Sequence, residues 1–195
     1  QKEVNERVAE SLETILQTTD KALRNWAEQL LVDVTAFAES DELQRNVEAQ
    51  LRASRNPDAL IRAPGLQNIR RLLSPAMKAR NFAGFSVIAP DGIQIAAAYD
   101  EHVGLREIVD ANPELLPKVM RGKTFLGLPF QSRVVFDQTS LPGMPYMTAS
   151  APIRNDQGYT MAVLTIRLDP RGELTKTTRL GRLGQSGETY AFDRH

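Results

Sequence analysis

The sequence contains no cysteine, and this absence excludes several kinds of chemistry. Without cysteine the chain can form no disulfide, use no thiolate nucleophile and build no cysteine-based metal site. Long apolar runs are missing too: no stretch reaches the roughly 18 apolar residues that a membrane span needs. The chain also lacks net charge, because 24 basic residues balance 24 acidic ones. This balance argues against a general nucleic-acid binder.

Motifs for catalysis or metal binding are equally scarce. Of the two histidines, His195 is terminal, and His102 follows an Asp-Glu pair in what we interpret as a solvated polar loop. Residues 184–188 resemble a nucleophile elbow, but the fifth position is Glu188 and a strand follows instead of a helix. The glycine-rich stretch 181–187 lacks the Lys-Ser/Thr of a phosphate-binding loop. We therefore expect no enzyme, no metal and no cofactor.

The strongest pattern in the sequence is an eleven-residue apolar repeat near its beginning. One row consists of Val4, Ile15, Trp26 and Phe37, and a second row consists of Leu12, Leu23 and Val34. Eleven residues in three turns give about 3.67 residues per turn, close to a relaxed α-helix. Neither proline nor glycine interrupts residues 1–56. The pattern predicts one long, nearly straight helix.

Breaks in this pattern predict where further helices begin and end. Residues 39–42 are typical of a helix end and restart, with Ser40 or Asp41 as N-cap, and a second helix is expected over 42–54. Two short helices are then expected over 64–73 and 75–80.

Basic side chains gather in the stretch 52–80, where seven of them accompany a single acidic residue, Asp58. A solvated face beside an acidic helix explains such a stretch, and so does contact with an anion or a lipid headgroup.

From Phe82 onward the pattern favours strands. Apolar runs on both sides of Pro90-Asp91-Gly92 predict a hairpin. The later segments follow in order: a helical stretch over 105–121 with Pro113 at N1 and Gly122 as its stop, extended segments over 124–130 and 132–136, strands over 145–154 and 159–168, and a helix from 169 to about 180. Strands split two plus three around a helix predict an α+β fold, in which the long N-terminal helix packs on a five-stranded antiparallel PAS-like sheet.

Three segments carry a resemblance to a known family. They are GFSVIAPDGIQIAAA (84–98), MTASAPIRNDQGYTMAVLTIRLDP (147–170) and GRLGQSGETYAFD (181–193). With the long entry helix, they resemble the double Cache (dCache) sensor family, in its membrane-distal PAS-like module. The resemblance implies an extracytoplasmic sensor between two membrane helices of a bacterial receptor, with a chemotaxis, kinase or cyclase output domain. The Arg-x-Trp-Tyr cluster of the amino-acid-binding branch is missing, because the only tryptophan is Trp26.

The same resemblance implies a domain organisation. Residues 1–56 would form the long helix and the second helix, and residues 57–180 the PAS-like Cache module. Residues 181–195 would form a linker and the first strand of a membrane-proximal module.

A ligand pocket is the expected functional site, on the sheet face that the helix does not cover. The candidate ligand-binding residues are Tyr99, Arg106, Phe130, Arg133, Asp137, Tyr146, Thr148 and Ser150. On the strand from 145 to 154 the polar set either hydrogen-bonds a ligand or faces water. Arg133 is a candidate for bidentate contact with a carboxylate, although a surface role fits it too. Packing in the core is the alternative for the aromatic residues.

Two functions remain in competition. In the first, a small organic ligand shifts the sheet against the long helix, and the helix carries that shift to the membrane. In the second, the chain is a structural or dimerisation module without a ligand of its own. Both allow a homodimer through the N-terminal helix within a full-length membrane protein.

Overall fold

The computed structural model describes residues 2–131 and 143–172. Residues Leu30–Asp169 form one compact unit, and the described residues outside it belong to a second unit. Within the described residues, no helix is both long enough and apolar enough to cross a membrane.

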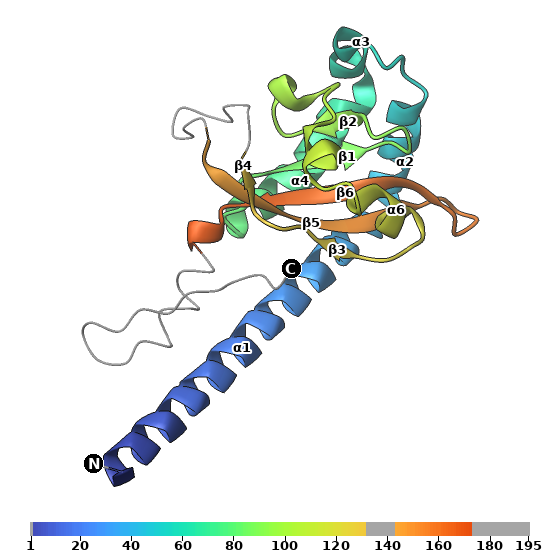
Figure 1. The fold of residues 1–195 in the computed structure, drawn as a ribbon. Coiled ribbons are helices and arrows are strands. Elements are labelled where there is room, and N and C mark those ends of the chain that lie inside the picture. Colours follow the sequence, from blue (N-terminus) through green and yellow to red (C-terminus); the bar gives the residue numbers. More distant parts are fainter. Residues whose placement is uncertain (1, 132–142, 173–195) are drawn as a thin grey trace. The chain divides into compact units, whose positions relative to one another are not determined.

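The long N-terminal helix is present as α1, Lys2–Ala38 (Figure 1). Its last turns belong to the compact unit, where Leu30, Val34 and Ala38 are buried at intervals of four residues. The helix ends before Ser40, whose side chain accepts a hydrogen bond from the backbone N–H of Leu43 and caps the next helix, α2, Asp41–Leu51. These features confirm the predicted helix, its break and its cap.

Two helices follow α2, and both differ from the prediction. The first, α3 (Pro57–Arg62), was not expected, and Asn56 caps it by accepting hydrogen bonds from Asp58 N and Ala59 N. Next, α4 (Pro64–Ala79) is a single helix with Pro75 inside it, where two helices were predicted. A proline inside a helix costs about 3 kcal/mol. The apolar stripe of α4 offsets that cost, because Leu66, Ile69, Leu73 and Met77 are all buried.

Several basic residues of the stretch 52–80 form ion pairs within the compact unit. Arg70 contacts the Asp100 carboxylate at 2.7 Å, and Arg80 contacts Asp33 at 2.8 Å. Arg55, just before α3, contacts Asp91 at 2.8 Å. These ion pairs favour the interpretation of a solvated face.

The sheet is antiparallel throughout, as predicted. Its strands are β1 (Gly84–Ile88), β2 (Gln94–Ala97), β3 (Phe125–Leu126), β4 (Phe130–Gln131), β5 (Pro145–Arg154) and β6 (Thr160–Leu168). The strand order is β2-β1-β6-β5-β3, and β4 pairs with β5 as one strand more than the five expected. Helix α4 packs against β1 and β2 and α2 packs against β2, whereas α6 (Leu115–Met120) packs against β5 and β6 (Figure 1).

The connection between β2 and β3 corrects another prediction. The single helical stretch expected over 105–121 is two short helices, α5 (Glu107–Ala111) and α6. Pro113 lies between them instead of at a first helical position, and it forces the preceding Asn112 out of the helical region, to φ −132° and ψ 76°. Gly122, with φ +86°, follows α6 and ends it, as predicted.

Candidate ligand-binding site

One face of the sheet carries a group of polar side chains from three neighbouring strands. Ser86 of β1 lies opposite Thr165 of β6, which lies opposite Ser150 of β5. In the next row, Arg167 of β6 lies opposite Thr148 of β5. Because side chains two positions apart share a face of a sheet, these residues point to the same side. We call Ser86, Thr148, Ser150, Thr165 and Arg167 the polar face.

The helices α5 and α6 cover the polar face. Ile88 and Val163 lie on the same side of their strands as the polar face, and both pack with Ile108, Leu115 and Val119 from the two helices. All five residues of the polar face are buried, and Ser150 and Thr165 share a hydrogen bond of 2.9 Å. Thr148 and Ser150 therefore do not face water, which was the alternative that the sequence left open.

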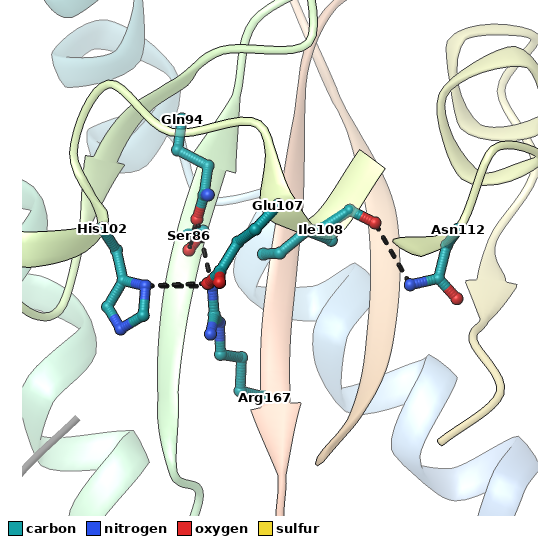
Figure 2. Close-up of polar contacts among 7 residues, drawn as sticks. All are labelled: Ser86, Gln94, His102, Glu107, Ile108, Asn112 and Arg167. Carbon is teal, nitrogen blue, oxygen red and sulfur yellow. Dashed lines mark hydrogen bonds and ion pairs between the residues drawn. The ribbon is translucent and has the colours of Figure 1, made fainter. Parts of the chain in front are cut away.

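An ion pair connects the polar face to the covering segment (Figure 2). The guanidinium of Arg167 donates to Oε1 of Glu107, the first residue of α5, at 2.5 Å. Nδ1 of His102 lies 2.9 Å from the same oxygen. Arg167 also donates to Gln94 Oε1 at 3.3 Å, and that oxygen accepts a hydrogen bond from Ser86 at 2.7 Å. The covering loop and three strands are thus joined by one polar network.

The charges in this network follow from burial and pairing. Burial opposes ionisation of Glu107, but the hydrogen bond from His102 and the charge of Arg167 outweigh it and hold the pKa of Glu107 at about 2. Burial lowers the pKa of His102, so its imidazole is neutral at pH 7 and donates from Nδ1 to Glu107. Burial also lowers the pKa of Arg167, an effect that Glu107 opposes. At pH 7 the network holds one carboxylate and one guanidinium.

A pocket of about 440 Å³ lies on the outer side of Glu107. Its lining residues are Leu105, Arg106, Glu107, Asp110, Ala111, Phe130 and Gln131. Arg106 lies 3.8 Å from the Asp110 carboxylate and also donates to the backbone carbonyl of Asp91. The pocket therefore offers charges of both signs beside an aromatic ring and short apolar side chains. Glu107 takes part in both the pocket and the buried network.

The segment that joins β3 and β4 packs closely against Thr148. Gly127 donates its backbone N–H to the Thr148 carbonyl at 2.7 Å. A side chain at this position would collide with other atoms, because a Cβ would lie 2.6 Å from Thr148 Oγ1 and 2.8 Å from Asn112 Oδ1. Within the described residues, the buried Thr148 hydroxyl has no hydrogen-bond partner. The segment thus covers the Thr148 hydroxyl without forming a hydrogen bond to it.

The structure places the predicted site residues in three groups. Arg106 and Phe130 line the pocket. Thr148 and Ser150 lie on the polar face, while Tyr146 is buried opposite Phe130 and Tyr99 is half-buried before the short helix η1, Asp100–His102. Arg133 and Asp137 lie outside the described residues.

Three residues at the centre of this arrangement, His102, Glu107 and Arg167, were not among the predicted site residues. His102 is buried instead of lying in a solvated loop, because Glu107 and the polar face enclose it. Arg167 was detectable as the one charged residue between apolar neighbours in the strand 160–168. Glu107 carried no comparable signal, since it lies among other charged residues of a helical stretch.

Comparisons with solved structures identify the fold. The sensor domain of DcuS from E. coli matches with a TM-score of 0.54 at 13% identity, over 84% of this chain and 97% of that domain. The sensor domain of the V. cholerae histidine kinase DctB matches with a TM-score of 0.56 at 13% identity, over 90% and 59%. The sensory domain of the C. jejuni chemoreceptor Tlp3, with isoleucine bound, matches with a TM-score of 0.54 at 13% identity, over 92% and 65%.

The chain therefore has the α+β fold of these sensor domains, which confirms the prediction of a PAS-like α+β fold. It spans less than two thirds of the DctB and Tlp3 domains. No protein-family model matches the chain, and no curated protein matches it.

Proposed function

We propose that this chain is the extracytoplasmic small-molecule sensor domain of a transmembrane signal-transduction receptor of the chemoreceptor, kinase or cyclase type. One observation carries the proposal. In a fold shared with sensor domains, a pocket adjoins a buried polar network through a single shared residue, Glu107. The domain acts by binding and not by catalysis.

The pocket lining favours a small organic ligand that is both charged and partly apolar. Arg106 suits an anionic group, Asp110 suits a cationic group, and Phe130 suits an apolar part. Tlp3 has been solved with isoleucine and with valine, which are ligands of this general kind. Binding transmits a signal only if the ligand prefers one of two conformations, and Glu107 offers the connection between pocket and sheet.

Thermal melts of the 195-residue chain against a library of amino acids, organic acids and amines test the proposal. A ligand at ten times its Kd should raise the Tm by about 3 °C or more. If no compound produces a saturable rise, the sensor function is contradicted.

Two aspartates serve as a matched pair for locating the binding. Asp110 lines the pocket and lies near an arginine four residues before it, whereas Asp58 lies on α3 near an arginine four residues after it. Asp110→Ala should reduce the Tm rise that a stabilising compound produces. Asp58→Ala should leave that rise unchanged.

A second function is favoured by two other observations. The charge of Arg167 is already matched inside the domain, and large apolar side chains are exposed on α1, including Leu12 and Leu16. A structural module that dimerises through α1 would have these features. Light scattering distinguishes the two: a particle of twice 21.7 kDa that becomes monomeric in Leu12→Glu/Leu16→Glu, with no ligand response, supports the dimerisation module.

The domain organisation belongs to the same proposal. Residues 57–180 would form the sensor module, while residues 181–195 would lead into a membrane-proximal module. Differential scanning calorimetry of a longer natural chain should then show a second unfolding transition. A single transition with an enthalpy that fits this chain alone would contradict the boundary.

A further inference from the structure

The pairing of Arg167 with Glu107 joins a central strand of the sheet to a short helix that packs on the sheet through Ile108 and Val109. Arg167 lies on β6, which is paired on both sides, with β1 and with β5. Glu107 lies in α5, a helix of five residues whose N-cap, Arg106, makes no side-chain cap hydrogen bond. The segment begins after Gly104, which has φ +87°, and ends at the non-helical Asn112. Of the two partners, Glu107 is therefore the one whose backbone is not part of a strand paired on both sides.

Glu107 is also the partner that a molecule in the pocket can reach. Its side chain keeps 15% of its surface exposed and lines the pocket, whereas the side chain of Arg167 keeps only 1%. Removing Glu107 would open the way from the pocket to the guanidinium. It would also leave a buried positive charge without a counter-ion, which is strongly unfavourable. Any movement of Glu107 therefore requires another anion at Arg167.

The surroundings of the Glu107 carboxylate are built from hydrogen-bond donors. The nearby donors are the guanidinium of Arg167 and the imidazole N–H of His102. The side-chain amide nitrogen of Gln94 is buried and has no hydrogen-bond partner within the described residues, and the same is true of the Thr148 hydroxyl on the polar face. Arg167 and His102 thus bind one carboxylate, and two further donors of the polar network and polar face are buried without a partner in the part of the chain that the structure describes.

We propose that Glu107 is a tethered substitute for the carboxylate of the ligand: it occupies Arg167 when the pocket is empty, and a ligand carboxylate displaces it. This inference rests on the proposed sensor function and adds an autoinhibitory contact to it. Displacement of Glu107 releases α5 from the sheet and preserves the charge balance at Arg167. Because a ligand must compete with the internal ion pair for Arg167, anions that bind Arg167 weakly do not displace Glu107.

The test uses formate and acetate as probes, so that it needs no identified ligand. Glu107→Gln removes the internal carboxylate and keeps the size of the side chain. The Tm of this variant should rise with formate or acetate, measured against sodium chloride at equal ionic strength, by about 3 °C at ten times the Kd. The unaltered chain should show no such rise, because Glu107 already occupies the site.

Two further variants act as controls. Glu114→Gln removes an exposed carboxylate that pairs with Lys118 and lies outside the pocket, so it should show no response to formate or acetate. Glu107→Gln/Arg167→Met removes the guanidinium as well and should lose the response. If Glu107→Gln does not fold in buffer alone, its refolding yield from urea is measured against acetate concentration, and recovery with acetate supports the proposal.

The proposal is overturned if acetate stabilises Glu107→Gln no more than Glu114→Gln, or stabilises the double variant equally well. It is also overturned if Glu107→Gln stays unfolded at every acetate concentration. These outcomes are independent of the library screen, because a chain without a response to any library compound can still show the acetate response of Glu107→Gln.

Discussion

Both faces of the sheet are buried at the central strands, but only one of them carries buried polar side chains. On the face away from α5 and α6, the central strands present Val87, Leu164 and Ile166, which are fully buried. On the other face the same strands present Ser86, Thr165 and Arg167. Burying apolar groups stabilises the fold, whereas burying polar groups costs stability unless each finds a partner. Ser86, Ser150, Thr165 and Arg167 have such partners, whereas the Thr148 hydroxyl has none within the described residues.

The largest effect in this comparison should come from breaking the ion pair on the polar face. Arg167→Ala leaves the Glu107 carboxylate buried without its counter-ion, and we expect a loss of about 3–5 kcal/mol in the free energy of unfolding. Urea denaturation followed by circular dichroism measures it. Arg167→Met/Glu107→Leu, which removes both charges, should recover most of that loss. If Arg167→Ala is as stable as Arg167→Met/Glu107→Leu, the Glu107 carboxylate does not need Arg167 as its counter-ion.

On the apolar face, a cavity should cost somewhat less. Leu164 is fully buried on β6, and Leu164→Ala should lower the free energy of unfolding by about 3 kcal/mol through lost burial and an unfilled cavity. The same urea titration applies. This variant should keep the response to any stabilising compound that the unaltered chain shows, since it leaves the polar face untouched. Loss of that response would indicate that the ligand binds on the apolar face, which contradicts the proposal.

Acid should weaken the polar face before it affects the apolar one. The folded pKa of Glu107, about 2, lies below its ordinary 4.5, so its contribution is complete above pH 4.5 and is lost as the pH falls toward 2. That contribution is on the order of 2–3 kcal/mol. The pKa of His102 is lowered as well, so protonation of the unfolded chain begins to cost stability below about pH 6.5.

Thermal melts between pH 7 and pH 2.5 measure this dependence. Glu107→Gln should make the Tm depend less steeply on pH below pH 4.5. A variant that loses stability as steeply as the unaltered chain below pH 4.5 would assign the acid sensitivity to other carboxylates.

The smallest effects on the free energy of unfolding should come from removing either of two hydroxyl groups on β5, and the two removals should differ. Ser150 shares a hydrogen bond with Thr165, so Ser150→Ala should cost about 1 kcal/mol. The Thr148 hydroxyl has no partner among the described residues, so Thr148→Val should leave stability unchanged or raise it by about 1 kcal/mol. Differential scanning fluorimetry of the two variants compares them directly. Equal losses would mean that both hydroxyls serve the fold alone.

Local signals in the sequence account for the parts of the fold that were predicted correctly. The eleven-residue repeat predicted α1, Ser40 predicted the start of α2, and Pro90-Asp91-Gly92 predicted the β1–β2 hairpin. The strand predicted over 145–154 has the bounds of β5. Each of these features depends on residues close together in the chain.

The ion pair could not be predicted in the same way. Glu107 and Arg167 are 60 residues apart, and they meet because α5 packs on the side of the sheet to which Arg167 points. Alternation along β5 placed Thr148 and Ser150 on one face, but the choice between ligand and water depended on what covers that face. The split of α5 from α6 was within reach, since Pro113 restricts Asn112, but the helical pattern on both sides outweighed that signal.

In the proposed function, a ligand binds on the side of the sheet that carries the polar face. Amide chemical shifts of the 195-residue chain, titrated with a compound that raises its Tm, test this claim most directly. We predict that the largest saturable changes fall on residues 105–111 and 130–131, which contain the pocket lining, and on Thr148 of the polar face. Changes confined to α2, α4 and the apolar face would contradict it.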